Sequence, residues 1–160
     1  TFSCVGLSTA RKFYNTPNRS AQKEDKMSET NVAVVKSIYD CFDVGDINGL
    51  LGLFSEGIIW DHRGIGAPDS PKNKLFRGKN GVKEFFDIIG DNQEILEHDV
   101  TDFIASGDKV VAVGFIRARV KKTGNEVASD WVQIWTLRDG LVCAWKVFAD
   151  FTADAIAFQQ

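Results

Sequence analysis

The sequence predicts an α+β domain in which a curved antiparallel sheet is wrapped around helices. The first half of the chain repeats apolar residues at helical spacing, whereas the chain beyond residue 90 alternates apolar and polar residues as strands do. Short glycine-containing turns separate the alternating segments, and such turns join antiparallel neighbours. The expected order of elements is therefore α-α-β-α-β-β-β-β.

Length and composition fit one globular domain. The chain has 160 residues, of which 44% are hydrophobic and 26% charged. A chain of this length buries enough surface for a sizeable core without metals or disulfides. The net charge of −3 gives no reason to expect a nucleic acid or a membrane surface as a partner. No apolar run approaches the length of a membrane span.

Cysteine and histidine are scarce. The three cysteines and two histidines do not have the spacing of a four-ligand zinc site, so no metal is expected. The sequence also lacks a glycine-rich phosphate loop, and we expect no organic cofactor. The odd number of cysteines favours a reducing compartment, and hence the cytoplasm.

Residues 1–27 differ in composition from the rest. The first 26 residues contain five basic and two acidic residues and are rich in Ser, Thr and Asn. They lack the apolar region of a secretory signal. We expect a poorly ordered basic extension, followed by one domain over residues 28–160. A transit-like segment, a leader and sequence upstream of a start at Met27 all stay open, so organellar targeting is an alternative to the cytoplasm.

Three segments repeat apolar residues every three or four positions, as amphipathic helices do. Ser28 or Thr30 is expected to cap the first helix, and Gly45 to end it. The second follows Asp46 as its N-cap, and the third covers residues 82–89. The segment 63–78 is rich in Gly and Pro and is expected to be a loop at the entrance of any pocket. Strands are expected at 57–62, 94–104, 109–121, 126–138 and 141–150.

Tryptophan and polar side chains share faces of three predicted strands. Side chains two apart along a strand point to the same side. The shared sets are Ile58, Trp60 and His62; Trp131, Gln133 and Trp135; and Cys143, Trp145, Val147 and Ala149. Each Trp alone is more often a core or interface residue, and a lone His is more often structural. Their conjunction predicts an apolar pocket in which His62 and Gln133 are the convergent polar groups.

Several short motifs occur in a characteristic order. They are Gly45–Leu50, Leu53-Phe54, Ile59-Trp60, Phe76–Val82, Phe85-Phe86, Gly107–Val111, Trp135–Gly140, Phe148 and Asp150. With these motifs, the chain from about Asn31 to Phe158 resembles the SnoaL-like, polyketide-cyclase and ketosteroid-isomerase-related group of the nuclear-transport-factor-2-like superfamily.

The resemblance implies a cystatin-like cone with an internal pocket, and a homodimer formed through the convex face of the sheet. The pocket would take a small hydrophobic molecule. The expected ligand-binding residues are Ile38, Tyr39, Phe42, Ile58, Trp60, Trp131, Trp135, Trp145 and Val147.

The ketosteroid-isomerase mechanism itself is disfavoured. Those relatives use a carboxylate base and two neutral donors, a Tyr and a protonated Asp. At the matching positions this chain has His62, Ile38 with Tyr39 one residue away, and Gln133. Asp61, beside the base position, is expected to face the other side of its strand.

Three functions remain open. An enzyme would carry out acid/base chemistry on a small carbonyl compound, as an isomerase, cyclase or hydratase does, with His62 as base and Gln133 as donor. A binding protein would hold the same molecule without turnover. An interaction module would instead place the Trp residues and Gln133 in a dimer interface. The basic stretch from Lys72 to Lys83 is expected to be a solvated loop.

Overall fold

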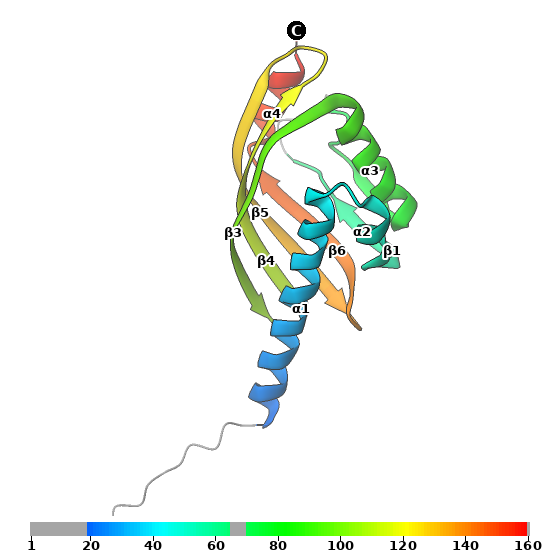
Figure 1. The fold of residues 1–160 in the computed structure, drawn as a ribbon, viewed down its shortest axis with the longest axis vertical. Helices are drawn as coiled ribbons and strands as arrows, with labels where there is room; N and C mark the ends of the chain where they lie inside the picture. The colour runs from blue at the N-terminus through cyan, green and yellow to red at the C-terminus, as the bar shows by residue number, and fades with distance from the viewer. Residues whose placement is uncertain (1–18, 65–69, 160) are drawn as a thin grey trace, which may run out of the picture.

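The computed structural model describes residues 19–64 and 70–159 and confirms the α+β class (Figure 1). Helices come mainly before residue 93 and long strands after it, as the change in sequence period predicts. The elements are α1 Arg19–Asp43, α2 Ile47–Gly52, β1 Phe54–Asp61, β2 Leu75–Arg77, α3 Gly78–Asn92, β3 Gln93–Ser106, β4 Lys109–Val120, β5 Glu126–Arg138, β6 Leu141–Ala149 and α4 Phe151–Phe158.

The strands form one six-stranded sheet in the order β2-β1-β6-β5-β4-β3. All neighbours pair antiparallel except β1 and β6, which are parallel. The predicted glycine turns join β3 to β4, β4 to β5, and β5 to β6, and their glycines have positive φ angles of 57°, 75° and 77°. The long strands curve around α1, and α2 and α3 lie on the same concave side (Figure 1).

Helix α1 begins at Arg19, so the predicted N-cap at Ser28 or Thr30 is wrong. Residues 19–27 include Ala, Gln, Lys and Glu, which are good helix formers, and no Gly or Pro interrupts this stretch. Thr30 Oγ1 donates to the carbonyl of Lys26 at 2.9 Å, an interaction of helix interiors. The described part of the expected N-terminal extension is therefore helical, and residues 1–18 lie outside the described residues.

Two elements were missed by the sequence analysis. Strand β2 lies within the segment 63–78 that was expected to be a loop, and its Phe76 pairs with Trp60 of β1. Residues 65–69 of that segment lie outside the described residues. Helix α4 follows β6, and Asp150 caps it because its Oδ1 accepts from Ala153 N at 2.9 Å. A three-residue strand and an eight-residue, mostly apolar helix are too short to show a clear period.

A bulge in β6 changes one predicted face. Thr136 pairs with Ala144 and Leu137 with Val142, so Cys143 is the extra residue. Val142, which is fully buried, takes the place beside Leu137 that alternation assigned to Cys143. Trp145 and Val147 remain on the inner face, as expected.

The core lies between the concave face of the sheet and the helices. Its largest fully buried side chains include Trp135, Phe54, Ile38 and Leu50. On the convex face, Ile104 and Phe148 are 59% and 50% exposed, respectively. The inner face therefore provides the surface on which a site can be enclosed.

Candidate functional site

A cavity of about 130 Å³ lies inside the cone, between the sheet and helices α1, α3 and α4. Nearly all the residues predicted to meet in a pocket line it: Ile38, Tyr39, Phe42, Trp60, His62, Trp131, Gln133, Trp135, Trp145 and Val147. Ile58 is the exception, because it is fully buried in the packed core and does not line the cavity. The inward-facing positions of separate strands thus converge on one hollow.

The volume limits what the cavity holds in this conformation. A dry engineered cavity of roughly 150 Å³ takes up benzene, whereas pockets for drug-sized ligands measure roughly 300–1,000 Å³. A volume of about 130 Å³ is therefore close to the size of one unsubstituted aromatic ring. A larger ligand requires side chains at the mouth to move.

Three tryptophans form a row across neighbouring strands. Trp60 of β1 is paired with Trp145 of β6, which is paired in turn with Trp135 of β5. The rings of Trp60 and Trp145 stack with centroids 3.9 Å apart and planes 16° apart. Trp135 meets Trp145 nearly edge to face at 6.0 Å. Such contacts hold large apolar rings in fixed orientations, which gives the cavity rigid walls.

Gln133 is held by two donors. The Tyr39 hydroxyl donates to Gln133 Oε1 at 2.7 Å, and Trp145 Nε1 donates to the same oxygen at 3.2 Å. Because an indole N–H is a donor only, the amide oxygen must face Trp145. The amide nitrogen then has no hydrogen-bond partner among the described residues, and Gln133 lines the cavity. This leaves an N–H donor for an oxygen inside the cavity.

Tyr39 links this network to helix α1. Its hydroxyl also accepts from Trp135 Nε1 at 3.2 Å. Burial is the main cause that raises the pKa of Tyr39 well above its ordinary value, so the phenol stays neutral and keeps its proton for Gln133. The sequence analysis placed Tyr39 in the pocket but missed this bond. The available signal was a polar side chain on the apolar face of the first predicted helix.

His62 is a buried neutral imidazole. Its ring lies 5.0 Å from Phe85 and 5.3 Å from Phe151, and its Nδ1 is buried without a hydrogen-bond partner. Burial, with a smaller contribution from the charge of Lys72, lowers the pKa of His62 to about 3. A base with this pKa is far from the ordinary range for proton abstraction near neutral pH.

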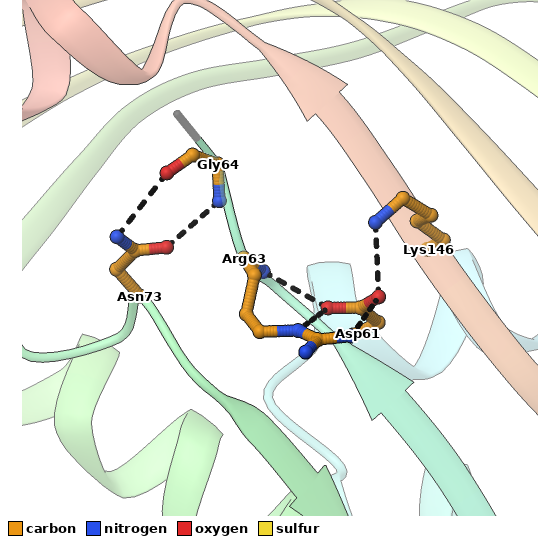
Figure 2. Close-up of polar contacts among 5 residues, drawn as sticks. All are labelled: Asp61, Arg63, Gly64, Asn73 and Lys146. Atoms are coloured by element: carbon orange, nitrogen blue, oxygen red, sulfur yellow. Dashed lines mark hydrogen bonds and ion pairs between the residues drawn. The ribbon is translucent and has the colours of Figure 1, made fainter. Parts of the chain in front are cut away.

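Asp61 points away from the cavity, as strand alternation predicts. Its carboxylate contacts Arg63 Nε at 2.8 Å and Lys146 Nζ at 2.9 Å (Figure 2). The hydrogen bond from Arg63 is the largest cause that lowers the pKa of Asp61 below its usual range. Beside it, the Asn73 side chain accepts from Gly64 N at 2.8 Å and donates to Gly64 O at 3.3 Å (Figure 2). Asp61 is therefore held by ion pairs outside the cavity, whereas its neighbour His62 lines the cavity.

A buried ion pair at the cavity wall was missed by the sequence analysis. Lys72 Nζ lies 2.9 Å from Asp154 Oδ1 and donates to Gln93 Oε1 at 2.8 Å. Ser70 Oγ donates to Asp154 Oδ2 at 2.8 Å. The prediction of a solvated loop is therefore wrong for Lys72, because α4 supplies a carboxylate that buries it. An acid within the apolar segment of α4 was the available signal.

The other lysines of the basic stretch pair at the surface. Lys74 contacts Glu84, Lys79 contacts Glu56 and Lys83 contacts Asp87. In the described part of the chain, no three His, Cys, Asp or Glu side chains gather as a metal site requires. No helix among the described residues has the length and apolar character to cross a membrane.

Comparisons with known proteins identify the family. A family model described as a SnoaL-like domain matches residues 35–145. A nuclear-transport-factor-2-like protein from Burkholderia xenovorans is 30% identical, with a TM-score of 0.75 over 82% of this chain and 98% of that one. The comparison with curated proteins found no match.

Two further solved structures share the fold at lower identity. TerC, co-crystallised with polyporic acid, is 24% identical, with a TM-score of 0.69 over 80% of this chain and 97% of that one. A protein from Xanthomonas campestris, provisionally described as a polyketide cyclase, is 15% identical. Its TM-score is 0.66 over 82% of this chain and 98% of that one. The match to the family model and the similarity to the Burkholderia xenovorans protein identify the same fold family. The chain therefore belongs to the SnoaL-like family of the nuclear-transport-factor-2-like superfamily.

Proposed function

We propose that this protein binds a small hydrophobic molecule inside the cone and holds one oxygen of that molecule through the amide of Gln133. The observation that carries the proposal is the arrangement around this amide. Tyr39 and Trp145 both donate to Oε1, which fixes the oxygen and leaves Nε2 without a partner at the cavity wall. A carbonyl, enol or ether oxygen would satisfy it.

The walls favour a flat apolar ligand. Trp60 and Trp145 supply stacked rings, and His62 is neutral at physiological pH because burial lowers its pKa. Removing the apolar surface of a ligand from water is the main gain on binding in such a pocket. The hydrogen bond to Gln133 then sets orientation more than affinity.

Catalysis is the second candidate, and the family supports it. Structural relatives include proteins provisionally described as polyketide cyclases and as an isomerase, which is consistent with acid/base chemistry at the same cavity. Gln133 would donate to the oxygen on which charge develops. His62 would take the proton, but its lowered pKa makes it a weak base. Turnover would therefore require a substrate with an acidic C–H, such as one between two carbonyl groups.

A homodimer through the convex face completes the proposal. Val132 pairs with Phe148, and Val111 pairs with both Ile104 and Ile134, so apolar side chains adjoin on this face. Trp131, Gln133 and Trp135 line the cavity. Their place in the cavity lining counts against an interaction module that would bury these three between subunits, and the proposed contact uses the opposite side of the strands. Cys41 and Cys143 are free thiols, in keeping with the cytoplasmic location that we propose.

Isothermal titration with two matched probes tests the binding function. Acetophenone and ethylbenzene share a skeleton, but only acetophenone carries an oxygen for Gln133. We expect both to bind, and acetophenone to bind about fivefold to tenfold more tightly, as one net hydrogen bond allows. The variant Gln133→Leu should abolish that difference and keep the affinity for ethylbenzene. Failure of both probes to bind would overturn the proposal.

A further inference from the structure

Lys72 gives the cavity a second polar wall. It comes from the segment before β2, whereas Gln133 lies on β5, and both residues line the cavity. Only 11% of the Lys72 side chain is exposed, so its ammonium group is largely shielded from solvent. A shielded lysine in the wall of an apolar cavity is an unusual feature for a pocket that only takes hydrocarbon.

The ammonium group has one N–H to spare. A lysine has three donors, and the described partners of Nζ are Asp154 Oδ1 at 2.9 Å and Gln93 Oε1 at 2.8 Å. Those two contacts fix the ammonium between α4 and β3. The third donor has no partner among the described residues.

The partner carboxylate is occupied by other donors. Asp154 Oδ2 accepts from Ser70 Oγ at 2.8 Å, and Oδ1 is shared by Lys72 and Gln93, whose Nε2 lies 3.5 Å away. The other carboxylate that lines the cavity, Asp150, caps α4 through Ala153 N. The pair therefore presents its positive member to a ligand more openly than its negative one.

The neighbouring imidazole responds to this asymmetry. After burial, the Lys72 charge is the largest electrostatic cause that lowers the pKa of His62, and the charges of Asp154 and Asp61 each raise it by less. His62 is neutral and adds no competing charge. An acceptor placed between His62 and Lys72 would lie beside the positive member of the ion pair.

We propose that Lys72 binds an ionised oxygen of the ligand, so that the natural ligand is a small aromatic or alicyclic molecule carrying a carboxylate or enolate group. The inference rests on the binding function proposed above and narrows its ligand class. The ring lies against the tryptophans, the ionised oxygen accepts from Lys72 Nζ, and a second oxygen can accept from Gln133. A charge-assisted hydrogen bond of this kind is stronger than a neutral one.

Benzoate and nitrobenzene separate the charge from the shape. Both are flat, have two oxygens on one ring substituent and have no donor at pH 7, but only benzoate is ionised. Nitrobenzene is the more hydrophobic, so an apolar pocket alone would favour it. We expect isothermal titration at pH 7 to show benzoate binding about tenfold more tightly.

Four variants complete the test. Lys72→Met should reverse the preference, and Lys72→Arg should retain it. Because Lys72→Met leaves Asp154 without its ammonium partner, Lys72→Met/Asp154→Asn provides a second version with an uncharged pair. Lys74→Met removes the same charge from an exposed lysine two residues away and should leave the preference unchanged. Circular dichroism verifies that each variant is folded.

The outcomes distinguish this inference from the function on which it rests. If nitrobenzene binds at least as tightly as benzoate to the unaltered protein, the role of Lys72 is wrong and the binding function stands. If the benzoate preference survives in the Lys72→Met/Asp154→Asn protein, the role of Lys72 is equally overturned. If neither probe binds, both proposals fail.

Discussion

Asp61 and His62 are adjacent in the chain, yet they lie in opposite electrostatic environments. Asp61 faces outward, where Arg63 and Lys146 keep it ionised and lower its pKa. His62 faces the cavity, where burial keeps it neutral and also lowers its pKa. Both pKa values are lowered, but the consequences are opposite. The lower pKa stabilises the charged form of Asp61, whereas it stabilises the neutral form of His62.

The comparison extends to the two faces of the whole sheet. Inward positions carry tryptophans and neutral polar groups joined to one another, such as Gln133 and Tyr39. Outward positions of β4 carry Arg117 and Arg119, which contact Glu126 of β5. One exception to this division is the Lys72–Asp154 pair, which places charges at the inner wall. Substitutions on the inner face should therefore lower the free energy of unfolding much more than substitutions on the outer face.

Breaking the inner ion pair should have the largest effect on stability. Asp154→Ala leaves the Lys72 ammonium buried without its carboxylate, and such a loss typically costs about 3–5 kcal/mol. Urea denaturation measures the change in the free energy of unfolding.

Asp87→Ala is the matched surface control. It removes the partner of Lys83 from an exposed pair one helical turn apart, which is worth at most about 0.5 kcal/mol. Equal losses in the two variants would mean that the inner pair is hydrated like a surface pair, and would contradict the contrast between the faces.

Removing the Tyr39 hydroxyl should have the next largest effect. Tyr39→Phe deprives Trp135 Nε1 of its acceptor and Gln133 Oε1 of one donor, at a cost of about 1–3 kcal/mol. The matched control is Thr136→Val on β5, the strand that carries Gln133. It removes a hydroxyl that accepts an exposed hydrogen bond from Lys109. Thermal unfolding should separate the two variants, and a Tyr39→Phe protein as stable as Thr136→Val would show that the network contributes little.

The pH dependence of stability should report the neutral state of His62. Its pKa is about 3 in the folded protein and ordinarily 6.5, so the unfolded chain binds a proton more readily between these values. The contribution of neutral His62 to the free energy of unfolding is therefore fully present above pH 6.5. It falls as the pH decreases, by about 1–2 kcal/mol between pH 7 and pH 5.

The variant His62→Gln isolates that contribution. It removes the titrating group, so its stability should decline less over the same range, while the lowered pKa of His98 acts equally in both proteins. Urea midpoints at pH 7 and pH 5 give the comparison. Parallel declines in the two proteins would show that His62 protonates normally in the folded state.

A change on the convex face should have the smallest effect on the fold and the clearest effect on assembly. Phe148 is 50% exposed, so Phe148→Asp should alter the stability of a monomer by no more than about 0.5 kcal/mol. We expect sedimentation velocity to show a dimer for the unaltered protein and a monomer for the variant. A monomer in both cases would remove the proposed dimer and leave the inner site untouched.

The sequence predicts the inner face because strand alternation is a local rule. The parity of Trp60 and His62, and of Trp131, Gln133 and Trp135, is enough to place these side chains on one side of their strands. The resemblance to the family supplies the order in which the strands meet. Together they bring nearly all the predicted residues to the cavity, as the structure has them.

The ion pair at the cavity wall lay beyond that reasoning. Lys72 and Asp154 are far apart in sequence and lie outside the long strands, and helix α4 was not predicted. Their contact depends on how α4 packs against β4 and β5, which is a matter of tertiary packing. Ile58 was missed for a similar reason. Strand alternation predicts that its side chain points inward, but it does not show whether other side chains fill the space beside it.

The most direct test of the account is a crystal structure of the protein soaked with acetophenone. We predict density for the ring within the cavity against Trp145, and the carbonyl oxygen within about 3 Å of Gln133 Nε2, the length of a hydrogen bond. A cavity that is collapsed or filled by protein side chains, or a ring bound only on the convex face, would contradict the central claim that this cone encloses a ligand site.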